Sequence, residues 1–314
     1  MLSRTADNLF WMARYVERSE NLARLLLVGH RMSSMARSLG NPGNEWQSTL
    51  TASGCASSFF EKHAEAVGPA VVEFLVTDAG NPSSIVSCID TARRNARSVR
   101  TALTTDAWEA LNQTWQQARR LQPGSLKTER LPELLEWVKE RSLLFGGACT
   151  NTMLYNDAYF FTRLGTLLER ADSTARILDV KHHVLLPGTE GGGGTLDHYQ
   201  WQSILRSASA LRSYHWLYHD RLEPSRIAEL LILRAEHPRS LVACLQQVAQ
   251  ILDQLASRYG GPRGECHRLA GEMHSRLRYG RIEDVFRSGL PGFLSGFLED
   301  LGRLGDEISR FYLR

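Results

Sequence analysis

Residues 15–26 read Tyr15-Val16-Glu17-Arg18-Ser19-Glu20-Asn21-Leu22-Ala23-Arg24-Leu25-Leu26, and residues 167–178 read Leu167-Leu168-Glu169-Arg170-Ala171-Asp172-Ser173-Thr174-Ala175-Arg176-Ile177-Leu178. The second segment keeps the Glu-Arg pair of the first, and it keeps the later Ala-Arg pair at the same spacing. Neither segment contains glycine or proline, and their apolar residues recur at helical spacing. Each segment is therefore predicted to form the middle of an α-helix.

Two more parts of the first half recur in the same order in the second half. Residues 46–50 match residues 201–205, and residues 73–89 match residues 229–245. Three matched segments at nearly one offset predict an internal duplication, with halves at about 1–150 and 151–314. Because each half holds only a few helices, we expect one continuous multi-helix bundle with approximate two-fold symmetry, forming a single domain over 1–314. Strand-like alternation is almost absent, so the predicted fold class is all-α.

The composition is that of an ordinary globular protein and argues against several classes of function. The 314 residues are 43% hydrophobic and 23% charged, with a net charge of +3. Both signs are interspersed, which argues against nucleic acid as a partner. No apolar run approaches the ~20 residues that span a bilayer, and the start has no apolar leader, so we expect no membrane segment and no signal peptide. The five cysteines lack metal-type spacing, which predicts reduced thiols and a cytoplasmic location.

Caps and helix breakers predict where several helices begin and end. We expect a first helix from about Leu9 to Leu39, capped by Asp7 or Asn8 and ended by residues 40–44, which include glycine and proline. Further helices are expected at about 45–66, 83–104, 106–121 and 132–144. Two cysteines fall at matched positions just inside helices, and we expect both in the core: Cys88 and Cys244.

The charges of the repeated segments form a stripe on each helix. A helical wheel places them on one face of each copy: Arg14, Glu17, Glu20 and Arg24 in the first, and Glu169, Asp172 and Arg176 in the second. The opposite face of each helix is apolar, as is typical of a side packed in a core. Small residues such as Ala13 and Gly165 flank the charges instead of a solvated fringe of lysine and glutamine. We therefore expect both stripes to face another helix or a cavity.

Three interpretations of the stripes are open on these residues. The first is a structural network, in which removing one partner of a buried ion pair costs on the order of 3–5 kcal/mol. The second is a polar pocket at the pseudo-two-fold axis, where arginines bind carboxylate or phosphate and acids bind an amine. The third is a metal or catalytic centre of paired carboxylates. Glu-x-x-His pairs are lacking and the nearby arginines would repel a cation, which counts against the third.

Two other features point less directly to ligands. His215 and His219 have the i, i+4 spacing of zinc ligands, but no third ligand is evident. The glycine-rich residues 188–194 would need a preceding strand and a following Lys-Ser/Thr to form a phosphate loop. Neither is present, so we expect a flexible loop between helices. We predict that this chain itself holds no metal and no cofactor.

The opening of the chain resembles the bacterial alpha-E domain family. The resemblance lies in residues 1–24, in Asn81-Pro82-Ser83-Ser84-Ile85 and in Leu168-Glu169-Arg170-Ala171-Asp172, and it covers essentially the whole chain. Members of this family are typically encoded beside a circularly permuted ATP-grasp amidoligase, a transglutaminase-like peptidase and sometimes a proteasome-like peptidase. The resemblance therefore implies a role in ATP-dependent amide-bond formation, with an ATP-grasp protein as partner.

Together, the residues and the resemblance favour a component that holds an amino-acid or peptide substrate, or that scaffolds the ligase. The residues expected to bind the substrate are Arg14, Glu17, Arg18, Glu20, Arg24, Glu169, Arg170, Asp172 and Arg176. Acids and arginines together suit a molecule that carries both charges, and the lack of a nucleotide motif assigns ATP chemistry to the partner. The alternatives are an independent enzyme with a carboxylate-based or metal centre, and a purely structural interaction module. No catalytic residue is assigned.

Overall fold

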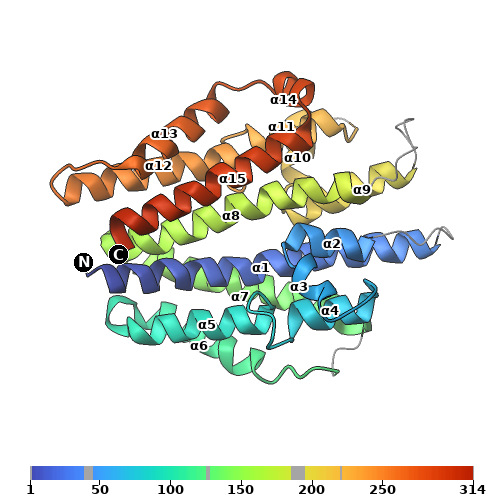
Figure 1. Ribbon diagram of the computed structural model, residues 1–314, viewed down its shortest axis with the longest axis horizontal. Coiled ribbons are helices and arrows are strands. Elements are labelled where there is room, and N and C mark those ends of the chain that lie inside the picture. The colour runs from blue at the N-terminus through green and yellow to red at the C-terminus, as the bar shows by residue number, and fades with distance from the viewer. Residues whose placement is uncertain (1, 39–44, 125–127, 185–194, 220, 314) are drawn as a thin grey trace.

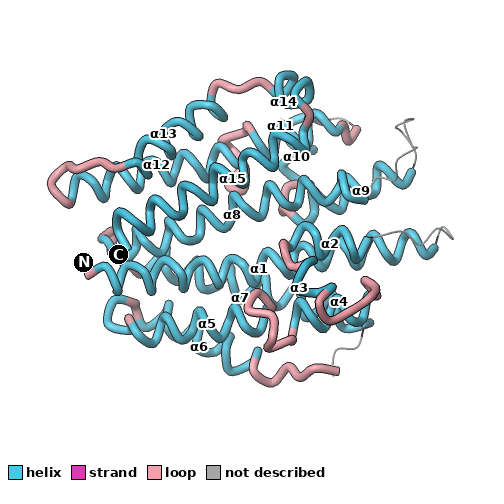
Figure 2. Tube along the Cα trace, in the orientation of Figure 1, coloured by secondary structure: helices cyan, strands magenta, loops and turns pink. Residues whose placement is uncertain are grey.

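All regular secondary structure in the described residues is helical. The computed structural model describes residues 2–38, 45–124, 128–184, 195–219 and 221–313. Within these ranges there are fifteen α-helices, three short 3-10 or π turns and no strand (Figure 2). The all-α prediction is confirmed.

The helices follow one another along the chain with short connections. The first seven are α1 (Ser3–Ser38), α2 (Glu45–Ser53), α3 (Ala56–Phe60), α4 (Gly68–Val76), α5 (Ile85–Ser98), α6 (Thr105–Ala118) and α7 (Leu131–Thr152). The others are α8 (Asp157–Val184), α9 (Thr195–Ser207), α10 (Leu211–Tyr218), α11 (Pro224–Ile232), α12 (Leu241–Arg258), α13 (Glu265–Arg278), α14 (Ile282–Ser288) and α15 (Leu290–Ile308). The short turns are η1 (Arg100–Ala102), η2 (Thr128–Arg130) and η3 (Ser309–Leu313). Among the described helices, none is long and apolar enough to cross a bilayer.

Two long helices, α1 with 36 residues and α8 with 28, lie side by side at the centre of the molecule (Figure 1). Leu9 and Leu26 of α1 and Leu164 of α8 are completely buried. A helix that is covered on most of its sides belongs to the core of a bundle. The two helices touch at Gly165, where an added Cβ would collide with the carbonyl oxygen of Phe10. Glycine at this position therefore sets how closely α1 and α8 approach.

The other helices pack in layers on either side of this central pair. Helices α5 and α7 contact α1 and are joined by α6, whereas α12 and α15 contact α8 and are joined by α13 (Figure 1). Helix α2 contacts both central helices. The turn η3 contacts α1, so the two ends of the chain lie at the same end of the bundle. This arrangement places most of the charged side chains of the two stripes inside the molecule.

The turns that lead into α5 and α12 share their hydrogen bonds. The amide of Ser84 donates to the Asn81 carbonyl at 3.0 Å, and the amide of Ser240 donates to the His237 carbonyl at 2.9 Å. Each serine hydroxyl then caps the helix that follows, as serine favours at a helix N-terminus. One turn further on lie two fully buried cysteines, as predicted: Cys88 and Cys244.

Several helix boundaries differ from the sequence predictions. The helix expected over 83–104 ends at Ser98, and η1 follows it as a separate turn. Helix α1 begins at Ser3, so Asp7 and Asn8 lie inside it and do not cap it; the Asn8 amide donates to the Arg4 carbonyl at 2.7 Å. The helix expected over 45–66 is divided into α2 and α3, because Gly54 adopts a φ of +72° that ends α2. Helix α7 continues past the expected end to Thr152. Residues 39–44 and the glycine-rich residues 188–194 lie outside the described residues.

Candidate functional site

The two repeated segments meet at the contact between α1 and α8 and bind each other through their Glu-Arg pairs. Arg18 of α1 donates Nε and Nη2 to the carboxylate of Glu169 at 2.6 and 3.1 Å. In return, Arg170 of α8 donates Nε and Nη2 to the carboxylate of Glu17 at 2.9 and 3.0 Å. Such two-point contacts fix both planar groups in one orientation. Each helix thus supplies the acid for one pair and the arginine for the other.

Two more arginines complete the surroundings of these buried glutamates. Arg14 donates Nε to Glu169 at 2.8 Å. Arg239, in the turn before α12, places Nη1 3.1 Å from Glu17. Every carboxylate oxygen of Glu17 and Glu169 therefore contacts an arginine of this chain. We call the set of charged residues around these two glutamates the Glu-Arg cluster.

Glu20 and Arg24 extend the Glu-Arg cluster along α1. Arg24 donates Nε and Nη2 to Glu20 at 2.8 and 2.6 Å, and Arg239 donates Nη2 to the same carboxylate. The Nη1 of Arg24 donates to the Ser207 carbonyl and to the Ser209 hydroxyl at the end of α9. Arg24 is among the largest fully buried side chains. A guanidinium can be buried in this way because its donors are paired.

Asp172 and Arg176 lie at the edge of the cluster. Arg176 donates Nε and Nη2 to Asp172 at 2.7 and 3.2 Å, one turn apart on α8. The side chain of Asp172 is 25% exposed, whereas that of the matching Glu20 is 1% exposed. Arg239 covers Glu20. The residue of the first half that aligns with Arg239 is Ser83, so the repeat supplies no matching arginine for Asp172. The second stripe therefore remains partly open where the first is closed.

Burial and the arginines act in opposite directions on the pKa values of the two central glutamates. Burial alone would raise the pKa of Glu17, but Arg170 and Arg239 outweigh burial and hold the pKa at about 2. Burial would also raise the pKa of Glu169, but Arg14 and Arg18 outweigh burial and lower it. Both carboxylates are therefore ionised at neutral pH and serve as hydrogen-bond acceptors.

Arg239 joins the cluster from outside α1 and α8 and was not predicted from the sequence. Because the aligned residue of the first half is Ser83, the repeat offered no second arginine to mark this position. Thr174 of α8 donates its hydroxyl to the Arg239 carbonyl at 2.8 Å and holds the turn against α8. The sequence signal that could have indicated Arg239 is its position directly before Ser240, the residue that caps α12.

The Glu-Arg cluster contains more positive than negative charge. Six arginines (14, 18, 24, 170, 176 and 239) surround four carboxylates (17, 20, 169 and 172). Such a balance repels a cation and attracts an anion. In the part of the chain that the structure describes, no group of three His, Cys, Asp or Glu side chains could hold a metal ion. His215 and His219 lie exposed at the end of α10, and no third ligand joins them there.

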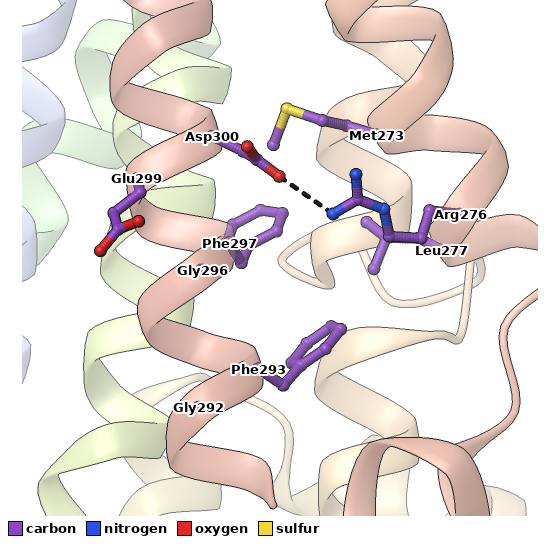
Figure 3. A pocket seen from close by; sticks show the side chains of 9 residues that line it. All are labelled: Met273, Arg276, Leu277, Gly292, Phe293, Gly296, Phe297, Glu299 and Asp300. Atoms are coloured by element: carbon purple, nitrogen blue, oxygen red, sulfur yellow. Dashed lines mark hydrogen bonds and ion pairs between the residues drawn. The ribbon is translucent and has the colours of Figure 1, made fainter. Parts of the chain in front are cut away.

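Two cavities in the described part are lined by residues outside the cluster. One, of about 300 Å³, lies between α13 and α15. Figure 3 shows Phe293 and Phe297 along α15 and the ion pair of Arg276 with Asp300, 2.9 Å long, spanning the two helices. The other cavity, of about 450 Å³, is lined by α10 and by the turn before α12. Neither is lined by a residue that the sequence predicted to bind substrate.

The fold and the cluster define an all-α protein whose two central helices are joined by reciprocal Glu-Arg pairs. The chain belongs to the Alpha-E family, described as a predicted alpha-helical domain with a conserved ER motif, and the match covers residues 1–313. The resemblance seen in the sequence is thereby confirmed. No solved structure matches the chain.

Curated relatives are similar to nearly the whole chain. Uncharacterized proteins of Mycobacterium bovis and Mycobacterium tuberculosis are each 25% identical to it over 323 residues, which cover 94% of this chain. The chain spans about a third (35%) of the length of these relatives. The similarity therefore concerns one part of longer proteins.

Proposed function

We propose that this chain is the scaffolding component of an ATP-grasp-linked system that forms amide bonds, and that the Glu-Arg cluster holds its two central helices together. The observation that carries the role of the cluster is the exchange in which Glu17 binds Arg170 while Arg18 binds Glu169. The link to an ATP-grasp ligase rests on what the family resemblance implies. A general base or a nucleophile needs a free lone pair directed at the reacting atom. Because arginines occupy every oxygen of both central glutamates, these residues suit a structural lock.

On this proposal, the ER motif of the family is the pair that makes the exchange. The chain contains Glu-Arg at 17–18, 129–130, 140–141 and 169–170. Arg130 pairs with the exposed Glu133 three residues later, and Arg141 donates to the hydroxyl of Thr114. The dipeptides at 17–18 and 169–170 place both of their members inside the cluster. The motif would then be conserved because each copy completes the other.

An internal duplication would explain why the exchange is symmetric. We propose that residues 1–150 and 151–314 derive from one ancestral helical unit. The three matched sequence segments support this, as do the matching turns before α5 and α12. One unit alone would present a Glu-Arg pair without a partner, whereas two units satisfy one another.

A second role, the holding of an amino-acid or peptide substrate, is supported by the surplus of positive charge. The side chains of Arg18, Arg170 and Arg176 are 27%, 19% and 33% exposed, and their bonds to carboxylates use Nε and Nη2. A carboxylate or phosphate group could reach the remaining nitrogen of such a side chain. The partly open pair of Asp172 and Arg176 is the best placed for this role.

Reconstitution with a circularly permuted ATP-grasp protein tests both roles. The two proteins are co-purified, with and without a transglutaminase-like protein, and the ATP-dependent product is measured by mass spectrometry. If the chain is a scaffold, the two proteins should form a stable complex. The Glu17→Gln variant should then lower product formation only in proportion to the loss of folded protein. A substrate site predicts that Arg176→Gln lowers product formation while the melting temperature is retained. Failure to form a complex, together with no change in the partner's product, would contradict the proposal.

An independent enzyme with a metal centre makes a different prediction. Purified protein would then contain stoichiometric zinc, iron or manganese in elemental analysis, and a chelator would change its melting temperature. The proposal expects neither result, because six arginines surround the acids of the cluster. Stoichiometric metal would overturn the ranking of these functions.

A further inference from the structure

The cavity beside α10 combines opposite charges with an exposed indole. Its lining residues are Arg212, Ser213, Trp216, Leu217, Glu236 and His237, and its volume is about 450 Å³. This volume lies within the range of small-molecule sites, which is roughly 300–1,000 Å³. Trp216 is 76% exposed, so its ring is available for contact with a ligand. Arg212 comes from the first turn of α10, and Glu236 comes from the turn before α12.

The wall of this cavity contains a buried histidine whose polar atoms are not all paired. His237 is only 4% exposed, and at least one of its ring nitrogens has no hydrogen-bond partner among the described residues. Burial and the nearby Arg239 lower its pKa to about 4, and the backbone of Ala208 partly opposes this shift. The ring is therefore neutral at pH 7, with one donor and one acceptor to satisfy. Buried polar groups without partners are rare and commonly mark a place where water or a ligand binds.

The corresponding part of the first half satisfies its polar groups internally. Asn81, which aligns with His237, donates its amide to the Phe74 carbonyl at 3.0 Å and accepts from the Ser83 amide at 3.0 Å. Close by, Lys62 pairs with Asp78 at 3.0 Å. The second half keeps the backbone turn but replaces these internal bonds with the cavity. The internal bonds of Asn81 therefore have no counterpart at His237, which lines the cavity instead.

We propose that this cavity binds a zwitterionic, amino-acid-like ligand with an apolar side chain, such as a free amino acid or the end of a short peptide. Arg212 would bind the carboxylate and Glu236 the ammonium group, while Trp216 and Leu217 cover the apolar side chain. His237 would form a hydrogen bond with the peptide amide of the ligand, or with a water molecule bound next to the ligand. The site shares no residue with the Glu-Arg cluster, so it goes beyond the scaffolding function and does not depend on it.

Calorimetric titration of the full chain with L-phenylalanine and glycyl-L-phenylalanine tests the proposal. N-acetyl-L-phenylalanine lacks the ammonium group, and L-phenylalaninamide lacks the carboxylate. We expect each to bind about 10- to 100-fold more weakly, because each loses one charge-assisted hydrogen bond. Arg212→Gln should abolish the discrimination against the amide, and Glu236→Gln should abolish the discrimination against the acetylated form. Trp216→Ala should weaken all four ligands together.

The matched control is Tyr279→Ala, which removes an aromatic ring that is also 76% exposed but lies outside the cavity. This variant should bind L-phenylalanine as the unchanged chain does. Because the three lining residues are exposed, their variants should keep the melting temperature and the complex with an ATP-grasp partner. Binding failure therefore remains distinguishable from failure of the scaffold. Absence of saturable binding to both zwitterionic probes, or discrimination that survives in Arg212→Gln and Glu236→Gln, would overturn the proposal.

Discussion

At the scale of single residues, the cluster is stable because each buried charge has a partner of opposite sign. An unpaired buried carboxylate would lose several kcal/mol of hydration, and the arginines replace the water that Glu17 and Glu169 give up. The lowered pKa values of both glutamates show that the arginines more than offset burial. The unequal charge count means that removing an acid leaves a larger imbalance than removing an arginine at the edge.

Removing one central acid should be strongly destabilising. Glu17→Gln leaves Arg170 and Arg239 facing a neutral amide, so the free energy of unfolding should fall by about 3–5 kcal/mol, as expected for breaking a buried pair. Urea unfolding followed by circular dichroism measures this change. Glu133→Gln is the matched control, because Glu133 pairs with Arg130 on the surface and should barely change the midpoint. Equal midpoints for the two variants would show that the cluster is not a lock.

The same residues predict loss of stability in acid. The pKa of Glu17 is about 2 in the folded protein and near 4.5 in the unfolded chain, so the folded state holds its proton less tightly. Its contribution is fully present above about pH 5 and is lost as the pH falls toward 2, amounting to roughly 3 kcal/mol. Glu169 acts in the same direction. Unfolding titrations between pH 6 and pH 2.5 should be steeper for the unchanged chain than for Glu17→Gln, and parallel curves would contradict this assignment.

The sequence predicted which residues gather at the centre, but not which of them touch. Arg18 and Arg170 lie outside the stripes that the helical wheel defined, yet they make the central contacts between the helices. The wheel assumes one buried face, whereas α1 and α8 are covered on most sides, so a residue a third of a turn away from the stripe also reaches the partner helix. Arg239 could not be inferred, because its neighbourhood depends on how the turn before α12 packs against α8.

At the scale of elements, α1 and α8 form the axis on which the other helices pack. Their existence followed from periodicity and from the lack of helix breakers. From the sequence, each stripe was expected to face another helix or a cavity, but which helix it would face was not predicted. The break between α2 and α3 was missed, although Gly54 is itself a local signal for the end of a helix and adopts the left-handed conformation there. Close approach of the central pair requires a residue without a side chain at Gly165.

Adding a methyl group at Gly165 should force the central helices apart. Gly165→Ala places a Cβ against the Phe10 carbonyl, and overpacking of this kind costs about 1–3 kcal/mol. Gly302→Ala in α15 is the control, because an added Cβ there meets nothing within 4 Å. In a helix interior that change should raise stability by up to about 1 kcal/mol. Thermal unfolding of both variants checks the prediction, and stabilisation by Gly165→Ala would refute close packing at this point.

At the scale of the whole molecule, the cluster makes each half of the chain depend on the other. The first half contains Glu17 and Arg18, and the second contains Arg170 and Glu169, so each bond of the exchange crosses between halves. Arg14, Arg24 and Arg239 add further crossings, at Glu169, at the Ser207 carbonyl and at Glu17 and Glu20. The bundle should therefore unfold as one cooperative unit.

Separate expression of residues 1–150 and 151–314 tests this dependence. Each half alone exposes the apolar surface between α1 and α8 and leaves its Glu-Arg pair unmatched, so neither should show a cooperative unfolding transition. Mixing the two should restore one transition and a complex that elutes at the size of the intact chain. A half that unfolds cooperatively on its own would indicate that the cluster is dispensable for folding.

The central claim is that the reciprocal Glu-Arg pairs hold α1 against α8, and a double-mutant cycle on Glu17 and Arg170 tests it most directly. The unfolding free energies of Glu17→Gln, Arg170→Gln and the double variant are compared with that of the unchanged chain. Residues in one buried network couple by about 0.5–3 kcal/mol, and we predict a value near the upper end of this range. Losses that add to within about 0.5 kcal/mol would contradict the claim, because they would show that the two residues act independently.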